Sequence, residues 1–420
     1  MKLIKADYIV PINKSPINDG YILFDKDKIL YVGKKKPEFK NMPVKNYDHA
    51  VILPGLVNSH AHLNYSAIST GKNMRLLPWV NDLISRWQKL SDIGKKRSAS
   101  IGARMMLESG VTCIADSTYE GYSVDALIEH SLKGIIFVEF FGFDERVLEE
   151  ALIKKKVWEK KIKNNLLKVS LSPHATYTTS GKLIKEASDL MGKMDLPISI
   201  HAAETEEELK LFKKGETGPF KILSEFKEPG FCWNIKKTTP IKFLTSLGLK
   251  SKTILNHCVA IEKGDIDVLK SAGFSVVHCP RSNALLGSGV SPVTSFIESG
   301  ILVSLGTDSL ASNTNYDFFE EMRASLVIQR AMGKNLSYDS ETILKMATIN
   351  GAESLSLKDV GSLEAGKKAD FVIIDLGSND LNKQYSIYDR IVMGSKKEHI
   401  IEVFINGDSV YQNDKYPKIK

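Results

Sequence analysis

Two histidines stand one residue apart at the end of an apolar run near the start of the chain. The run reads PGLVNSHAHL over residues 54–63 and follows three apolar residues, 51–53. This pattern predicts a buried strand. Because residues i and i+2 of a strand project from one face, His60 and His62 would point the same way and could grip one cation. Two of nine histidines can also fall close together by chance, so the pair alone leaves both interpretations open.

The elements that would position these side chains are short, apolar, β-branched runs. They are VILPGLV (51–57), VTCIADS (111–117), GIIFVEFFG (134–142), KVSLSP (168–173), PISIH (197–201), TILNH (253–257), FSVVHCP (274–280) and ILVSLGTD (301–308). Helical patterns such as 205–214 and 264–272 separate most of them. Eight strands alternating with helices predict the α/β class and a (β/α)₈ TIM-like barrel. An open doubly wound sheet is the alternative, but the chain lacks its glycine-rich dinucleotide turn.

Chemistry in such a barrel collects at the carboxyl ends of the strands. Six histidines and one aspartate fall at the expected strand ends: His60, His62, His174, His201, His257, His278 and Asp308. A lone histidine is more often a core or surface residue than a ligand, but this convergence predicts a metal site. Imidazoles with one carboxylate suit Zn²⁺, and a catalytic zinc site generates hydroxide near neutral pH. Such a hydroxide attacks an electrophilic carbon.

Glu204, in the stretch HAAET, follows His201 by three residues. A carboxylic acid at this place can give its proton to a ring nitrogen and so polarise the carbon under attack. It could equally be an acid in the first turn of the following helix, where acids are favoured. The two roles are compatible, and the catalytic one is the hypothesis we favour.

The motifs PGLVNSHAHL, HAAET, NHC, HCPRSN and LGTDSLASN, in this order, resemble the metal-dependent amidohydrolase superfamily, and within it the nucleoside and base deaminase branch. The resemblance covers nearly the whole chain, including GSLEAGKKADFVIIDL near the C-terminus. It implies one divalent ion, Zn²⁺ with Fe²⁺ or Mn²⁺ as alternatives, on four ligands: His60, His62, His201 and Asp308. It also implies that His257 orients the hydroxide or the attacked group, that Asp308 relays the water proton to departing ammonia, and that Glu204 protonates the ring.

Two groups of this branch match the pattern best. One comprises the S-adenosylhomocysteine/methylthioadenosine deaminases, and the other the 6-aminodeoxyfutalosine deaminases of an alternative menaquinone pathway. The former carry a ribose-binding glutamate nine residues after a tryptophan, where this chain has Gln88 after Trp79, and an arginine after the third strand, where it has Glu139 in VEFFG. Because hydrogen bonds to the ribose decide such recognition, these departures favour aminodeoxyfutalosine. The first group, with adenosine among its substrates, is the alternative.

Further substrate contacts follow from the same resemblance. His174 in SPHATY matches a stretch whose histidine contacts the nucleoside, and Ser282 and Asn283 in HCPRSN line the same mouth. With Trp79, Gln88, Glu139 and Glu204 they complete the expected substrate side of the site. Phe220 and Trp233, in the long connection over residues 215–235, could close over the 5′ group or simply anchor that loop.

Two other functions fit the motifs less well. Triazine chlorohydrolases share the fold and much of the motif set, but they typically dispense with an acid at the position of Glu204 because chloride leaves without a proton. Glu204 therefore favours an amine leaving group. Non-catalytic relatives that serve as interaction modules have lost metal ligands, whereas every expected ligand is present in this chain.

Composition excludes several classes of partner. The net charge of +7 comes from 57 basic and 50 acidic residues, and the densest basic stretch, 153–168, has helical spacing with apolar Ile153, Val157, Ile162 and Leu166. We interpret it as the solvated face of an amphipathic helix, not a nucleic-acid surface. No apolar stretch approaches the roughly 20 residues that span a bilayer. No signal peptide is evident, and the four cysteines lack CxxC spacing, which indicates reduced thiols and a cytoplasmic protein.

The two ends of the chain look β-rich and resemble each other. YILFDKDKILYVG (21–33) predicts a hairpin, and IIEVFINGDSVYQND (400–414) predicts another around Asn406-Gly407, the favoured type I′ pair. We therefore expect a small β-sandwich built from residues 1–52 and 361–420, flanking a barrel over 53–360. A small nucleoside is the expected partner, and the resemblance implies that a homodimer or larger assembly is common.

Overall fold

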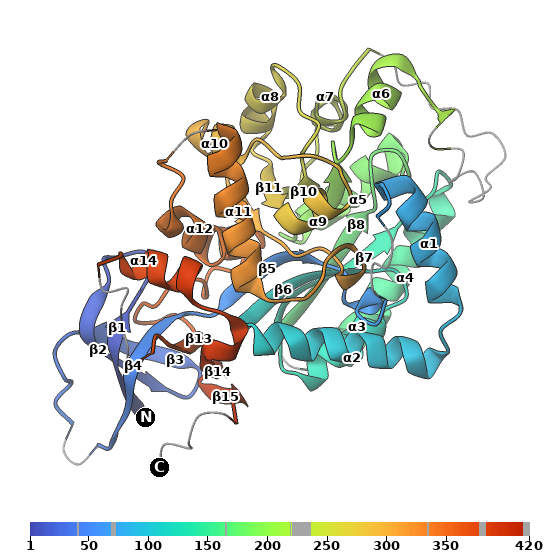
Figure 1. The fold of residues 1–420 in the computed structure, drawn as a ribbon. Helices are drawn as coiled ribbons and strands as arrows, with labels where there is room; N and C mark the ends of the chain where they lie inside the picture. Colours follow the sequence, from blue (N-terminus) through green and yellow to red (C-terminus); the bar gives the residue numbers. More distant parts are fainter. Residues whose placement is uncertain are drawn as a thin grey trace.

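A larger α/β body and a smaller sheet lie side by side in the computed structural model of the chain (Figure 1). The structure describes residues 1–39, 42–68, 73–163, 166–218, 220, 237–333, 336–377 and 384–414. In this part of the chain, no helix combines the length and the apolar character needed to cross a membrane.

The smaller part is one seven-stranded sheet drawn from both ends of the chain. Its order is β15-β14-β13-β4-β1-β2-β3, and its strands are β1 (Lys2–Ile9), β2 (Ile17–Asp25), β3 (Lys28–Gly33), β4 (Val44–Pro54), β13 (Phe371–Asp375), β14 (Ile400–Ile405) and β15 (Asp408–Gln412). Both predicted hairpins are confirmed, and Asn406 and Gly407 have φ values of 52° and 77°, as a type I′ turn requires. The expected two-sheet sandwich is not confirmed. The physical reason is β4, which pairs with β1 on one side and β13 on the other and so joins both halves into a single sheet.

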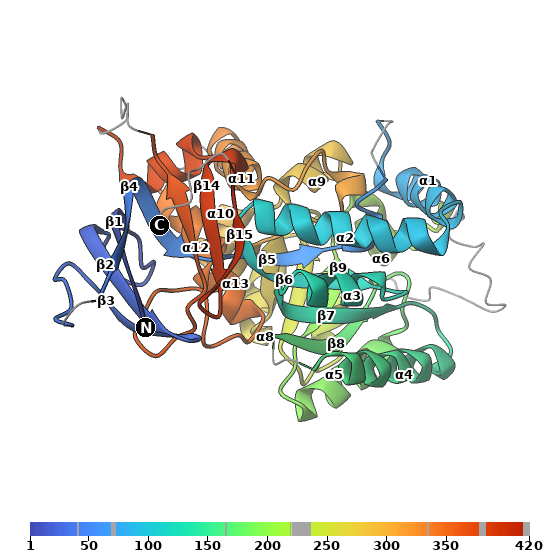
Figure 2. The same ribbon diagram turned by 90° about the horizontal axis from the view of Figure 1, so that it is seen from below.

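The larger part holds two parallel four-stranded sheets. One contains β5 (Leu56–Ala61), β6 (Val111–Thr118), β7 (Lys133–Phe140) and β8 (Leu167–Pro173), and the other β9 (Ile198–Ala202), β10 (Thr253–His257), β11 (Ser275–His278) and β12 (Val303–Leu305). Each of the eight predicted runs overlaps one of these strands, and the first covers the end of β4 and the start of β5. Isolated parallel bridges link the two sheets at both edges, Ala61 with Asp308 and Ala175 with His201. Figure 2 shows β5–β8 following one another along one side of this body.

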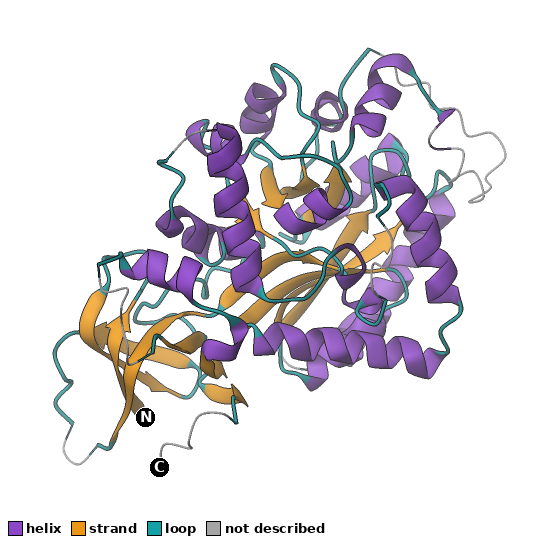
Figure 3. Cartoon of the chain, viewed as in Figure 1, coloured by secondary structure: helices purple, strands orange, loops and turns teal. Residues whose placement is uncertain are grey.

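Helices cover the outer faces of these sheets (Figure 3). The longer ones are α1 (Leu76–Gln88), α2 (Asp92–Glu108), α3 (Tyr122–Glu129), α4 (Glu145–Lys161), α5 (Gly181–Lys193), α6 (Glu206–Lys214), α8 (Asp265–Ala272) and α11 (Phe318–Gly333). Shorter ones are α7 (Pro240–Ser246), α9 (Pro280–Leu285), α10 (Val293–Glu298), α12 (Ser340–Met346), α13 (Ile349–Ser354) and α14 (Ile387–Asp389), with η1 (Leu63–Tyr65), η3 (Leu310–Ser312), η4 (Arg390–Gly394) and η5 (Lys397–His399). The strands and helices of the larger part pack apolar side chains against one another in a large buried cluster.

One prediction about the basic stretch 153–168 is wrong, namely which face of its helix is buried. Its helix, α4, ends at Lys161, and Ile153 and Val157 are 62% and 51% exposed instead of buried. The buried stripe contains Lys155 and Trp158. A tryptophan removes more apolar surface from water than isoleucine or valine, so it sets the inward face of the helix.

Gly306 lies where β12 meets β5, directly against a predicted metal ligand. A Cβ atom at this position would lie 2.8 Å from Val277 Cγ1, 2.9 Å from His60 Cβ and 3.0 Å from the His60 carbonyl oxygen. We expect Gly306→Ala to lower the free energy of unfolding by about 1–3 kcal/mol, because overpacking forces its neighbours to shift. Displacement of His60 should also lower the metal content. Denaturant unfolding and elemental analysis measure the two effects.

The matched control is Gly394→Ala, since a Cβ atom at Gly394 would meet nothing within 4 Å. Equal behaviour of the two variants would contradict the tight approach of β12 to β5.

Candidate metal centre and active site

The four predicted metal ligands meet in one buried cluster, although they lie far apart in the sequence. His60 and His62 come from the end of β5, His201 from β9, and Asp308 from the segment after β12. His62 Nε2 lies 3.3 Å from His201 Nε2, and Asp308 Oδ1 lies 3.7 Å from Nε2 of both His60 and His62. Backbone hydrogen bonds from Thr307 N and Asp308 N to the His60 carbonyl oxygen hold the two strand ends together.

Contacts behind the cluster fix which ring atoms face its centre. His62 Nδ1 lies 3.0 Å from the Ser117 carbonyl oxygen, and His201 Nδ1 lies 2.7 Å from the His174 carbonyl oxygen. A carbonyl can only accept, so each Nδ1 carries the proton and each Nε2 presents a lone pair. This is the arrangement of metal-bound histidines in proteins.

Asp308 is oriented by two hydroxyl groups. Ser282 Oγ and Ser312 Oγ donate to Asp308 Oδ2 at 2.6 and 2.8 Å, which leaves Oδ1 toward the histidines. Ser282 was predicted as a substrate contact, and the structure places it against Asp308. Sequence reasoning missed Ser312; its only signal was a serine four residues after Asp308 in LGTDSLASN.

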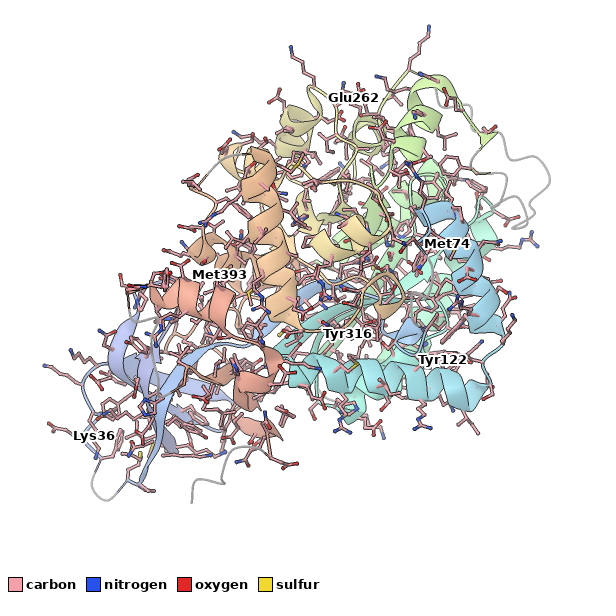
Figure 4. The ribbon with its side chains drawn as sticks, viewed as in Figure 1. Lys36, Met74, Tyr122, Glu262, Tyr316 and Met393 are labelled. Carbon is pink, nitrogen blue, oxygen red and sulfur yellow. The ribbon has the colours of Figure 1, made fainter. Side chains whose placement is uncertain are left out.

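Tyr316 ties the loops that follow β5 and β12. It is labelled in Figure 4, near the middle of the larger part. Its hydroxyl accepts from Leu310 N at 2.9 Å and lies 3.3 Å from Ser66 Oγ. The loop that carries Asp308 is therefore anchored to the loop that follows His62.

Burial makes this a set of neutral imidazoles. It lowers the pKa of His60 well below its usual value and that of His62 to about 4, and it also lowers the pKa of His201. Neither ring nitrogen of His60 has a hydrogen-bond partner among the described residues. Buried polar atoms left without partners are costly. A divalent cation would satisfy these lone pairs and neutralise Asp308, so the donor set fits the expected metal.

Glu204 and His257 stand beside the cluster as predicted. Glu204 Oε1 lies 3.9 Å from His257 Nε2, and Glu204 is 4% exposed. Burial raises the pKa of Glu204 to about 8, so its carboxyl group holds a proton at neutral pH. His257 Nδ1 lies 2.8 Å from Asn283 Oδ1, which places Asn283, a predicted substrate contact, behind His257. His257 and Asp308 both have left-handed backbones, with φ of 75° and 58°, a strained conformation that collects at functional sites.

Glu139 brings a second buried carboxyl group to the cluster. It lies at the end of β7, and one carboxylate oxygen is within 4.8 Å of the ligand nitrogens of His62 and His201. Its Oε1 has no hydrogen-bond partner in the described part of the chain. Burial, with Asp116 and Asp308 nearby, raises the pKa of Glu139 to about 8.

Aromatic rings lead from the cluster to the surface. The centroid of the His174 ring lies 4.9 Å from that of His201 and 6.3 Å from that of Phe141. Phe141 in turn stacks on Tyr119, with ring centroids 5.1 Å apart. Tyr119 is 38% exposed. His174, a predicted substrate contact, is therefore the inner member of a wall that could receive a flat or apolar group.

The other predicted residues of the substrate side are placed differently. Trp79 is buried and donates from Nε1 to the Ala311 carbonyl oxygen at 2.9 Å, which anchors α1 on the loop after Asp308. Gln88 is exposed at the last position of α1. Phe220 packs against Tyr177, with ring centroids 5.1 Å apart. Trp233 lies outside the described residues. His278, the last residue of β11, is buried.

Comparisons with known proteins show the family to which the chain is similar. The model of the amidohydrolase family matches residues 51–410. A 5-methylthioadenosine/S-adenosylhomocysteine deaminase of Clostridium tetani is 32% identical over 96% of this chain and 91% of its own length. A 5′-deoxyadenosine deaminase of Methanopyrus kandleri is 30% identical over 96% and 92%.

Solved structures match over almost the whole fold. A zinc-bound adenosine deaminase from Xanthomonas campestris has a TM-score of 0.84 at 22% identity and covers 100% of this chain and 94% of its own. The aminofutalosine deaminase of Helicobacter pylori, in complex with methylthio-coformycin, has a TM-score of 0.83 at 22% identity, covering 98% and 100%. At this identity the matches establish the TIM-barrel type of fold.

The hydroxyl groups behind Asp308 generate a prediction. Ser312→Ala should weaken zinc binding by about 10- to 100-fold, the usual cost of losing a hydrogen bond to a metal ligand. Competition with a chromogenic chelator measures the affinity. Ser271→Ala, an exposed serine on α8, is the control; if both variants bind zinc as the wild type does, Ser312 does not orient Asp308.

Proposed function

Because the chain belongs to the amidohydrolase family, we propose that it is a metal-dependent hydrolase of a cyclic amidine. Its reaction would remove the 6-amino group from the adenine ring of a 5′-modified adenosine and release ammonia. The observation that carries this proposal is the buried carboxyl group of Glu204, whose pKa burial raises to about 8, beside His257 and the four predicted ligands. An acid at this place is what a poor leaving group such as an amine needs.

The metal would be one divalent ion held by His60, His62, His201 and Asp308. The chemistry of this donor set supports zinc, and Fe²⁺ or Mn²⁺ would suit the same ligands. When bound, the ion would lower the pKa of a water molecule and supply the nucleophile at neutral pH.

The chain's own residues would handle the protons. Glu204 would give its proton to the ring nitrogen next to the attacked carbon. Burial opposes the ionisation of Asp308, but its pKa still lies below the usual value, in part because Ser282 donates a hydrogen bond to the carboxylate, so Asp308 is ionised and can accept a proton. Asp308 would then pass that proton to the departing amine, while His257, held by Asn283, would orient the attacked group.

The 5′ substituent defines the candidate substrates. The first is 6-aminodeoxyfutalosine of menaquinone synthesis, supported by Glu139 and the surrounding VEFFG. The second class comprises 5′-methylthioadenosine, S-adenosylhomocysteine and 5′-deoxyadenosine, supported by the names of the curated relatives. The ring wall of Tyr119, Phe141 and His174 would suit an apolar or aromatic 5′ group in either case.

We also propose that strands β5–β12 form one closed (β/α)₈ barrel over residues 53–360. The bridges at both sheet edges support this closure, and the cluster then lies at the carboxyl ends of the strands, as in other barrel enzymes. Residues 1–52 and 361–420 would form the accessory domain. The enzyme would work in the cytoplasm on small nucleosides, as a homo-oligomer.

An ammonia-release panel tests the substrate. We expect purified zinc-loaded protein to deaminate at least one of aminodeoxyfutalosine, S-adenosylhomocysteine, methylthioadenosine, 5′-deoxyadenosine and adenosine, and not cytosine, guanine or a chlorotriazine. The loss of adenine absorbance and the ammonia formed are measured together. Chloride release from the triazine without turnover of any purine nucleoside would replace the proposal by a chlorohydrolase.

Glu204→Gln should lower kcat by about 10²- to 10⁴-fold while leaving one metal ion bound, because the amide cannot transfer a proton. In the wild type, kcat should fall as pH rises through about 8, where Glu204 loses its proton. Elemental analysis and pH–rate profiles check both points. Exposed Glu206→Gln is the control, and loss of the metal with Glu204 would make it a ligand instead of an acid.

A further inference from the structure

Glu208 is a fully buried carboxylate that the mechanism above does not use. It lies in the first turn of α6 and is 0% exposed. One of its oxygens, Oε2, accepts a hydrogen bond from Glu204 N at 2.8 Å, and Oε1 accepts from the hydroxyl of Thr176. Donors from two loops therefore converge on one side chain.

A helix-capping role explains only part of this arrangement. Thr205 is the N-cap of α6 and accepts from Glu208 N at 3.2 Å, which is one half of a capping box. In the other half, the glutamate reaches back to the N–H of the N-cap residue itself. Here the carboxylate reaches past Thr205 to the N–H of Glu204. Its backbone partner is therefore the general acid itself.

The backbone at Ala203 shows why such a hold is needed. Ala203 has a φ of 50°, a left-handed conformation that is unfavourable for alanine. Its carbonyl oxygen accepts from Val259 N at 2.8 Å and Ala260 N at 2.7 Å, in the loop after His257. The peptide group between Ala203 and Glu204 is thus held at both ends. Its N–H group donates to Glu208, and its carbonyl oxygen accepts from the loop after β10.

We infer that Glu208 is a positioning residue for Glu204, an inference that rests on the proposed function. Its carboxylate fixes the turn at Ala203, and with it the direction in which the Glu204 side chain leaves the backbone toward His257. Through Thr176 it also connects this turn to the loop that carries His174. When ionised, Glu208 accepts from both donors, one at each oxygen, whereas an amide would present its own NH₂ group to one of them.

Glu208→Gln tests the inference because it keeps the size of the side chain. We expect kcat to fall by about 100-fold, within the range that a positioned acid contributes, with KM and zinc content close to those of the wild type. Exposed Glu206→Gln, the same change in the same helical turn, should leave all three unchanged.

A double variant separates positioning from general support of the fold. If Glu208 acts through Glu204, Glu204→Gln/Glu208→Gln should be no slower than Glu204→Gln alone, since residues that act as one unit are not additive. Losses that multiply would assign Glu208 a structural role and overturn the inference.

A structural measurement distinguishes this failure from failure of the proposed function. If the wild type deaminates no nucleoside, the function is wrong, but the crystal structure of zinc-bound Glu208→Gln still tests the positioning. We expect Ala203 to leave the left-handed region and the Glu204 carboxyl group to move away from His257. An unchanged turn would overturn the inference whatever the activity.

Discussion

The junction between the end of β5 and the segment after β12 is the constraint on which the candidate site depends. Two backbone N–H groups, of Thr307 and Asp308, donate to the His60 carbonyl oxygen, and Gly306 leaves room for this approach. The first and last strands of the larger part thereby bring Asp308 to His60 and His62. This junction sets the positions of the three side chains. The hydroxyl groups behind Asp308 and the contact by which Trp79 anchors α1 then stabilise that arrangement.

Burial then sets the protonation states. The same exclusion of water lowers the pKa of His60, His62 and His201 and raises that of Glu204. The histidines are therefore neutral and offer lone pairs, while the carboxylic acid of Glu204 keeps its proton. Groups exposed to water would not show this combination of protonation states at neutral pH. Burial thus prepares both the metal ligands and the proton donor for a hydrolytic reaction.

The strands could be predicted because short apolar, β-branched runs mark buried strands. The four ligands were assigned from the resemblance to a family, and the structure places them close together. Ser312 and Glu208 could not be found in this way, since their roles depend on which loop they meet in space. The inward face of α4 was also predicted wrongly, because it depends on where Trp158 packs. Ser282 and Asn283 were placed in the right region, but only the structure shows that they face Asp308 and His257.

The central position of β4 in the terminal sheet has a consequence for synthesis. Its partner β13 lies more than three hundred residues later in the chain. During translation the edge of β4 stays open until the ribosome has released the last strands, and an open edge can pair with another chain. Chains that end before β13 would leave this edge unpaired, and we expect such fragments to aggregate.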